Sequence, residues 1–123
     1  MKPAELIATL RDRLMIDDLT LSEHGVCSVF FDEDEVVFEC RDNLMFIYGE
    51  IGSAQDREDL YPELLKSSHL GLGAAYGSLG LDVKGENFTL TRVLEGDLDY
   101  ELFEKRLADF LVALRYWKQR LTE

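Results

Sequence analysis

The first segment of the chain has apolar residues at helical spacing. They fall on one side of a predicted helix over residues 3–15: Leu6, Ile7, Leu10 and Leu14. Pro3 fits the first turn, because the N–H group that proline lacks has no intrahelical partner there. The chain therefore begins with an amphipathic helix.

Runs rich in aromatic and β-branched residues follow this helix. They predict strands over residues 25–31, 36–41 and 44–49. The connections between these strands are short and charged or polar, with Asp32–Glu35 between the first two. Such tight connections predict a three-stranded antiparallel meander.

Helical spacing returns in the middle of the chain. Ser53 is a candidate N-cap for a helix over residues 54–70, and Pro62 within that run predicts a late start or a break. A glycine-rich stretch over residues 71–80 follows. This stretch is expected to be a loop of small residues.

The last part of the chain combines two short strands with a long helix. The strands are predicted over residues 81–83 and 87–93, and Asp97 or Asp99 is expected to cap a helix that ends near Leu121. The element order is α-β-β-β-α-β-β-α. The predicted fold class is α+β, with a twisted antiparallel sheet packed by helices and residues 1–123 as a single domain.

The predicted strands carry apolar residues on both faces. In the first strand, Cys27, Val29 and Phe31 alternate with Val26 and Phe30. In the third, the two faces are Leu44, Phe46 and Tyr48 on one side and Met45, Ile47 and Ile51 on the other. A sheet of this kind needs a cover on both sides. The terminal helices can cover one face, and the other must meet the middle helix, a second copy of the chain, or a client protein.

Composition and charge narrow the classes of partner. The 123 residues are 46% apolar and carry a net charge of −12, and residues 1–60 alone hold five basic and 15 acidic side chains. The negative electrostatic field of these charges repels phosphate backbones and anionic membranes, so neither nucleic acid nor a membrane is expected as a partner. No signal peptide or membrane span is recognisable, and a cytoplasmic protein is expected.

Sequence motifs that indicate catalysis or the binding of a cofactor or metal are scarce. Gly71–Tyr76 begins like a dinucleotide loop but follows a predicted helix, and Asp32–Glu35 lacks the turning glycine of a calcium loop. The residues His24, Cys27, Cys40 and His69 lack the paired short spacing of structural zinc sites. We therefore expect no catalytic residues, no metal site and no cofactor, and the protein is not expected to be an enzyme.

The two cysteines allow one inference about register. If residues 32–35 form a four-residue loop, Phe31 pairs with Val36 and Cys27 faces Cys40. The favoured interpretation is two small buried side chains, and a redox pair is the alternative.

The chain resembles class I type III secretion chaperones of the Tir-chaperone type. The resemblance lies in the first strand and its acidic turn (Leu21–Asp32), the third strand (Leu44–Gly52), the end of the middle helix (Leu64–Leu70), the glycine-rich stretch, and the closing helix with Trp117. The family often places a glycine just after the first helix, where this chain continues with Leu14-Met15-Ile16.

The resemblance implies a homodimer that needs no ATP and holds the N-terminal segment of a secreted effector in extended form. Dimerisation is expected through residues 60–83, with candidate contacts at Leu60, Leu64, Leu72, Tyr76, Leu79 and Leu81. The effector is expected on the exposed side of the first helix and the neighbouring strands, at Leu6, Ile7, Leu10, Leu14, Val29 and Phe31. A regulatory adaptor or anti-activator that uses the same surface is the alternative function.

Overall fold

The computed structural model describes all residues, 1–123, and confirms the α+β class. The elements are α1 (Pro3–Leu14), β1 (Val26–Phe31), β2 (Asp34–Arg41), β3 (Leu44–Ser53), α2 (Tyr61–Ser68), β4 (Ser78–Leu81), β5 (Asn87–Glu95) and α3 (Tyr100–Leu121). Short 3-10 turns at Glu58–Leu60 and His69–Gly71 flank α2.

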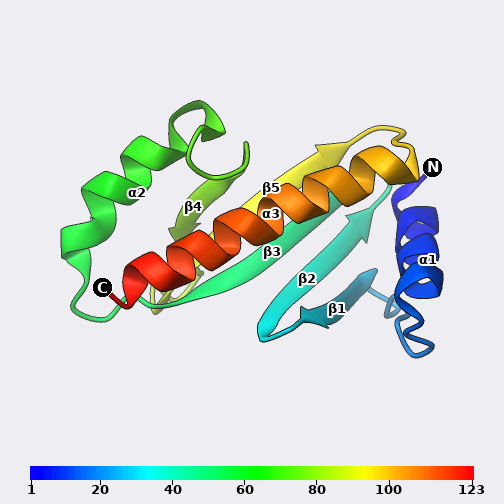
Figure 1. The fold of residues 1–123 in the computed structure, drawn as a ribbon, viewed down its shortest axis with the longest axis horizontal. Helices are drawn as coiled ribbons and strands as arrows, with labels where there is room; N and C mark the ends of the chain where they lie inside the picture. The colour runs from blue at the N-terminus through cyan, green and yellow to red at the C-terminus, as the bar shows by residue number, and fades with distance from the viewer.

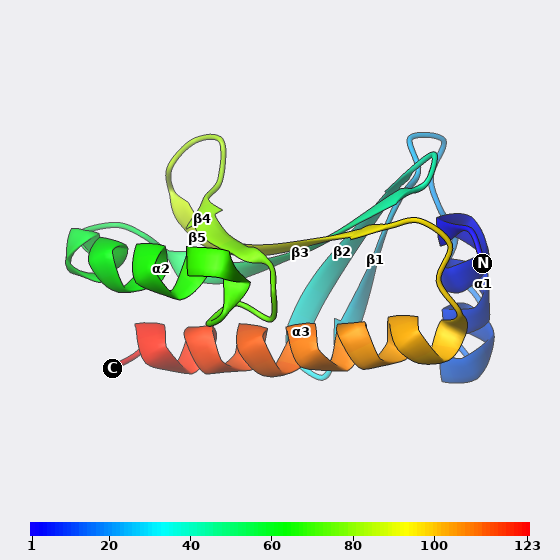
Figure 2. The same cartoon turned by 90° about the horizontal axis from the view of Figure 1, so that it is seen from above.

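The five strands form one antiparallel sheet in the order β1-β2-β3-β5-β4. The predicted meander of the first three strands is therefore confirmed. In Figures 1 and 2, α3 runs along one face of the sheet, α1 stands at one end, and α2 lies at the other end beside β4. We call the face toward α3 the inner face and the opposite one the outer face.

The long helix α3 is fixed to the inner face by an apolar stripe and a cap. The Asp99 carboxylate accepts a hydrogen bond from the Leu102 N–H at 2.7 Å, which makes Asp99 the N-cap. The buried side chains of the stripe are Phe103, Leu107, Phe110, Leu114 and Trp117. A Cβ on Gly49 of β3 would lie 2.9 Å from both methyl carbons of Leu114, so only glycine permits this close approach.

The hairpin between β1 and β2 corrects the predicted register. Phe31 pairs with Asp34 across a two-residue loop, so the predicted four-residue loop was wrong. Asp32 takes a positive φ of 58° as the first loop residue, a conformation that aspartate tolerates. The shift moves the pairing by two residues, which leaves every side chain on its predicted face. Cys27 accordingly pairs with Phe38, and not with Cys40.

The middle of the chain also differs from its prediction. Helix α2 has eight residues and begins at Tyr61, so the late start that Pro62 predicted is confirmed and residues 54–57 are not helical. Strand β4 comprises Ser78–Leu81, which is earlier than the predicted residues 81–83. The strand is placed by Ser68, whose hydroxyl accepts a hydrogen bond from the Leu79 N–H at 3.0 Å.

Met15 ends α1 in the left-handed conformation, with a φ of 57°. A glycine would adopt this conformation without strain. The chain therefore keeps a left-handed helix end although methionine occupies the position.

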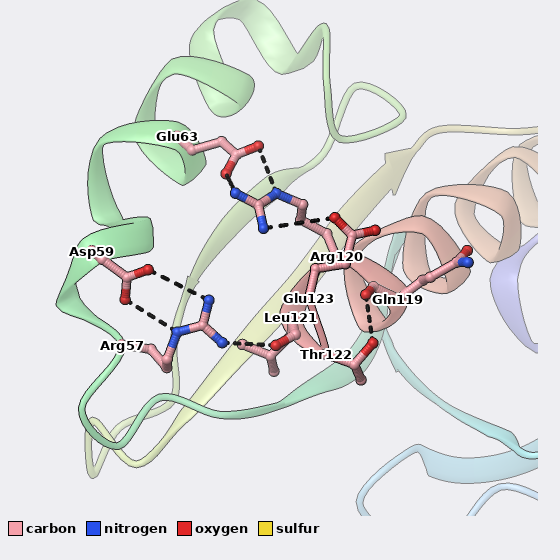
Figure 3. Close-up of polar contacts among 8 residues, drawn as sticks. All are labelled: Arg57, Asp59, Glu63, Gln119, Arg120, Leu121, Thr122 and Glu123. Atoms are coloured by element: carbon pink, nitrogen blue, oxygen red, sulfur yellow. Dashed lines mark hydrogen bonds and ion pairs between the residues drawn. The ribbon is translucent and has the colours of Figure 1, made fainter.

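Two arginine contacts join the C-terminal end of α3 to α2 and the segment before it (Figure 3). Arg57 donates a hydrogen bond to the Leu121 carbonyl at 2.7 Å and pairs with Asp59 at 3.1 Å. Arg120 pairs with Glu63 of α2 at 2.9 Å. These contacts hold α2 against the end of α3.

Candidate functional site

The outer face of the sheet has no helix over it (Figure 2). Val37 pairs with Tyr48 and Tyr48 with Thr91, while Phe46 pairs with Val93 in the next row. The apolar side chains among them, Val37, Phe46 and Tyr48, are half-buried, and Val93 is exposed. Of the three covers that the sequence analysis left open, α2 is excluded, because it lies at the end of the sheet beside β4.

Strand β1 is an edge strand with one hydrogen-bonded neighbour, β2. Its sequence, Val26–Phe31, contains no proline and no charged residue of the kind that blocks pairing with another strand. Phe30 is 65% exposed on its outer side, an unusual position for so large an apolar side chain. The edge of β1 can therefore accept an additional strand.

A hollow of about 310 Å³ lies beside the end of β1. Phe31, Leu111 and Val112 supply its apolar lining, and Asp32 and Arg115 are among its polar groups. The hollow lies between the tip of the β1–β2 hairpin and α3, next to the contact that joins them. It is wide enough for one large apolar side chain next to the strand edge.

A partly buried ionic contact next to this hollow joins β2 to α3. Asp34 accepts hydrogen bonds from Arg115 at 2.7 and 3.0 Å and from Lys118 at 2.9 Å. Burial alone would raise the pKa of Asp34, but the hydrogen bonds and charges of Lys118 and Arg115 outweigh it and keep this pKa below its ordinary value. Asp34 is therefore ionised at neutral pH.

The structure separates the six residues predicted to contact an effector. Leu6, Ile7 and Leu10 are each 2% exposed and Val29 is also buried, so these four belong to the protein core. Helix α1 packs this apolar side against α3 and β2. Leu14, at 41% exposure, and the half-buried Phe31 remain accessible.

The six candidate dimer contacts divide in a similar way. Leu60, Leu64 and Leu79 are buried within the chain itself. Leu72, Tyr76 and Leu81 are exposed, together with two leucines that the sequence analysis did not select, Leu65 and Leu70. A hollow of about 190 Å³ lies between α2 and β4, lined by residues that include Leu65 and Leu81. Exposed leucines at this end of the sheet are therefore concentrated around α2 and the loop after it.

The loop between α2 and β4 has strained backbone at three residues other than glycine. Leu70, Ala75 and Tyr76 all have positive φ, at 54°, 51° and 62°. The Trp117 indole donates a hydrogen bond to the Gly73 carbonyl at 2.9 Å, and Arg92 donates one to the Tyr76 carbonyl. The loop is thus fastened to the domain while Leu70, Leu72 and Tyr76 point to solvent.

The two cysteines are free thiols, Cys27 buried and Cys40 half-buried. Burial raises the pKa of Cys27 to about 11, and the nearby Cys40 adds to this effect. No group of three or more histidine, cysteine, aspartate or glutamate residues is placed to hold a metal ion. None of the helices is both long and apolar enough to cross a membrane.

Two features of the surface were missed by the sequence analysis. The ionic contact of Asp34 was overlooked because residues 32–35 were predicted to form a charged four-residue loop, although a two-residue loop is the commonest hairpin connection. Phe30 was placed on the correct face but not selected as a contact. Its position on an edge strand is the missing information, and strand order is not encoded in alternation alone.

Solved structures with the same fold include a chaperone–effector complex and a type III secretion chaperone. The crystal structure of the ExsC–ExsE complex matches with 20% identity and a TM-score of 0.80, over 97% of this chain and 96% of the matched chain. The HopA1–SchA chaperone–effector complex matches with 20% identity and a TM-score of 0.78, over 94% and 91%. The Yersinia pestis type III secretion chaperone SycH, in complex with a fragment of YscM2, matches with 15% identity and a TM-score of 0.73, over 93% and 98%.

Comparison of the sequence with protein families identifies one family. No curated protein sequence matches this chain. The Tir chaperone protein (CesT) family, a family of chaperones and not of enzymes, matches residues 5–118. The element order, the antiparallel sheet and this match over nearly the whole chain together place the protein in the Tir chaperone protein (CesT) family.

Proposed function

We propose that the protein is a cytoplasmic chaperone for a type III secreted effector. It binds the N-terminal segment of the effector in extended form and keeps it soluble and competent for secretion. Membership of the Tir chaperone protein (CesT) family supports this function. The observation that carries it is the unprotected edge of β1 with the exposed Phe30 beside it.

The proposed binding mode is addition of a strand to β1. Backbone N–H and C=O groups of the effector segment pair with the free edge, and this pairing depends little on the effector sequence. Side chains of the effector segment point alternately to the two faces of the sheet. On the outer side they contact Phe30, and on the inner side they enter the hollow beside Phe31. Such binding needs no nucleotide, because hydrogen bonds and apolar contacts with the effector segment supply all of the affinity.

Of the six residues predicted as effector contacts, Leu14 and Phe31 are proposed to touch the effector directly. Leu6, Ile7, Leu10 and Val29 support this surface from within the core. Phe30 joins the contact set because it is the most exposed side chain of aromatic type on the sheet edge.

We also propose that the protein is a homodimer through α2, β4 and the loop between them. Leu72, Tyr76 and Leu81 are its direct contacts, with Leu65 and Leu70 added. Several exposed leucines on one end of a small domain are typical of a surface that another chain covers. Leu60, Leu64 and Leu79 pack beneath that surface.

Co-expression with candidate effector N-terminal segments, followed by size-exclusion chromatography, tests the chaperone function. The wild-type protein should co-elute with a segment, and Phe30→Lys should lose it, because lysine on an edge opposes strand addition. Tyr116→Lys is the matched control, since Tyr116 is an exposed aromatic residue on α3 outside the proposed surface. A segment that co-elutes equally with all three proteins would contradict binding at β1.

A second experiment distinguishes the effector chaperone from the alternative function, a regulatory adaptor. If a pull-down from the native host recovers a transcriptional regulator and no secreted protein, the regulatory adaptor is favoured over the effector chaperone.

A further inference from the structure

Two adjoining hollows combine apolar and acidic side chains, the first on the outer face of the sheet and the second lined by residues of the sheet, of the β1–β2 turn and of α3. The first hollow has a volume of about 290 Å³ and is lined by Val26, Val37, Glu39, Phe46, Tyr48 and Thr91. The second has a volume of about 230 Å³ and is lined by Glu33, Glu35, Val37, Tyr48, Glu50 and Lys118. Val37 and Tyr48 line both, so the two hollows lie side by side.

The charges in the second hollow are predominantly negative. Its three carboxylates face a single amine, and that amine, Lys118, already donates a hydrogen bond to Asp34 at 2.9 Å. In the first hollow the Glu39 carboxylate pairs with Arg41 at 2.9 Å. Glu35 and Glu50 are exposed and have no salt-bridge partner in the structure. An unneutralised negative field therefore lies next to an apolar hollow.

Tyr48, which joins the two hollows, reflects both properties. Burial raises its pKa, and the nearby carboxylates of Glu50 and Asp82 raise it further. Its ring is half-buried although no helix covers this face. The side chain is thus part of an apolar surface under a negative potential.

We propose that the outer face, around Val37, Phe46 and Tyr48, binds a part of the effector in which an apolar side chain is followed closely by lysine or arginine. This inference rests on the proposed chaperone function and adds the chemical class of segment that the surface selects. The apolar side chain enters the first hollow, and the cationic group reaches the carboxylates of the second. This contact is separate from strand addition at the edge of β1.

Charge decides between this occupant and a second copy of the chain. Two copies stacked through the outer face would bring Glu35, Glu39 and Glu50 against the same carboxylates of the partner, in a protein with a net charge of −12. Like charges opposed across an interface disfavour such an assembly. A segment with apolar and cationic side chains meets no such repulsion and gains attraction to both hollows.

Three short synthetic peptides of equal length test the proposal: one with Leu and Phe alternating with Lys, one with Glu replacing each Lys, and one with Ser replacing each Leu and Phe. Binding is measured by isothermal calorimetry, and the contact surface is mapped by amide chemical shifts in two-dimensional NMR. Only the first peptide should bind well, with shifts centred on Val37, Phe46 and Tyr48. Its affinity should fall as salt rises from about 0.1 to about 1 M, where the screening length drops from about 10 to about 3 Å.

The double substitution Glu35→Lys with Glu50→Lys should weaken binding of the Lys-containing peptide by about fivefold or more, because two attractions become repulsions. Asp109→Lys with Glu123→Lys changes the net charge equally at exposed positions on α3 and beyond its end, and should leave the affinity unchanged. Unchanged amide spectra outside the substituted sites establish that both variants are folded. Equal binding of the Lys and Glu peptides, or shifts centred away from the outer face, overturns the proposal.

Different results would contradict the outer-face contact and the proposed chaperone function. An effector segment that still co-elutes with the Glu35→Lys, Glu50→Lys variant at wild-type affinity, but not with Phe30→Lys, overturns the outer-face contact and leaves the chaperone function standing. Absence of binding to every effector segment overturns the chaperone function itself.

Discussion

Asp34 at the start of β2 and Arg115 in α3 are joined by two hydrogen bonds, at 2.7 and 3.0 Å, although they lie 81 positions apart in the sequence. The contact fixes the tip of the β1–β2 hairpin to the long helix. Since β1 has only β2 as a neighbour in the sheet, the position of its free edge depends on this hairpin. The ionic contact thereby orients the surface proposed to bind the effector.

Replacing Asp34 with asparagine should destabilise the fold. The substitution keeps the size of the side chain but removes the charge that Arg115 and Lys118 contact, and hydrogen bonds to charged groups contribute about 1.5–3 kcal/mol. We expect the free energy of unfolding to fall by about 1–3 kcal/mol, measured by urea denaturation at one fixed protein concentration. Asp32→Asn, at an exposed loop position, is the control. Equal midpoints for the two variants would show that the contact adds no stability.

The same carboxylate predicts how stability depends on pH. The pKa of Asp34 is lower in the folded protein than the value of about 3.9 expected in the unfolded chain. Its contribution is therefore fully present above pH ~4 and is lost as the pH falls through the folded pKa. The difference in unfolding free energy between wild type and Asp34→Asn should be largest at neutral pH and should shrink below pH ~4. A difference that stays constant in acid would exclude ionisation of Asp34 as its source.

The sequence pattern predicted the elements and their faces more reliably than their contacts with solvent. The alternation correctly grouped Cys27 with Val29 in β1, and Met45 with Ile47 in β3, because side-chain direction within a strand follows from period two alone. The stripe on α1 was also predicted correctly, but not which partner it meets. An apolar stripe looks the same whether it packs against α3 or against another protein, so the burial of Leu10 could not be derived from spacing.

The hairpin between β1 and β2 shows a second limit. Four consecutive acidic residues suggested a solvated loop, and the basic residues that neutralise Asp34 are in α3. A contact between residues so distant in sequence leaves no local pattern. The exposed position of Phe30 depends likewise on the order of strands in the sheet.

Leu10 and Leu14 of α1 provide a direct test of the core assignment. Leu10→Ala should lower the free energy of unfolding by about 2–5 kcal/mol, because it leaves a cavity among buried side chains. Leu14→Ala should cost less than about 1 kcal/mol, because much of this side chain is already in water. Urea denaturation of both variants checks the difference. If Leu14→Ala also keeps its stability but binds the effector segment more weakly, Leu14 is a contact residue as proposed.

The cysteines should be free and unreactive in the folded protein. Burial raises the pKa of Cys40 as it does that of Cys27, so little thiolate is present at pH 8. Alkylation by iodoacetamide should be much slower in the native protein than in urea, as measured by mass spectrometry. Replacing Cys27 with alanine and Cys40 with serine should preserve effector binding. Loss of binding in a folded double variant would favour a redox role instead.

The surface around α2 and β4 predicts the assembly state of the protein. Leu72 is 70% exposed on a loop that Trp117 and Arg92 hold in place, so its position does not depend on a flexible tail. The free energy falls when a second chain covers large apolar side chains that are otherwise held rigidly in water. The ion pair between Arg120 and Glu63 keeps α2 in place beside this loop (Figure 3).

Leu72→Glu should convert the protein from a dimer to a monomer at micromolar concentration, because a charge at the centre of an apolar interface loses its hydration without gaining a partner. Light scattering coupled to size-exclusion chromatography measures the mass of each variant. Val112→Glu is the matched control, since Val112 is exposed to a similar degree on α3, away from the proposed interface. The control should remain a dimer, and circular dichroism should show both variants folded. A wild-type protein that is a monomer under these conditions, or a Leu72→Glu variant that stays a dimer, contradicts the interface through α2 and β4.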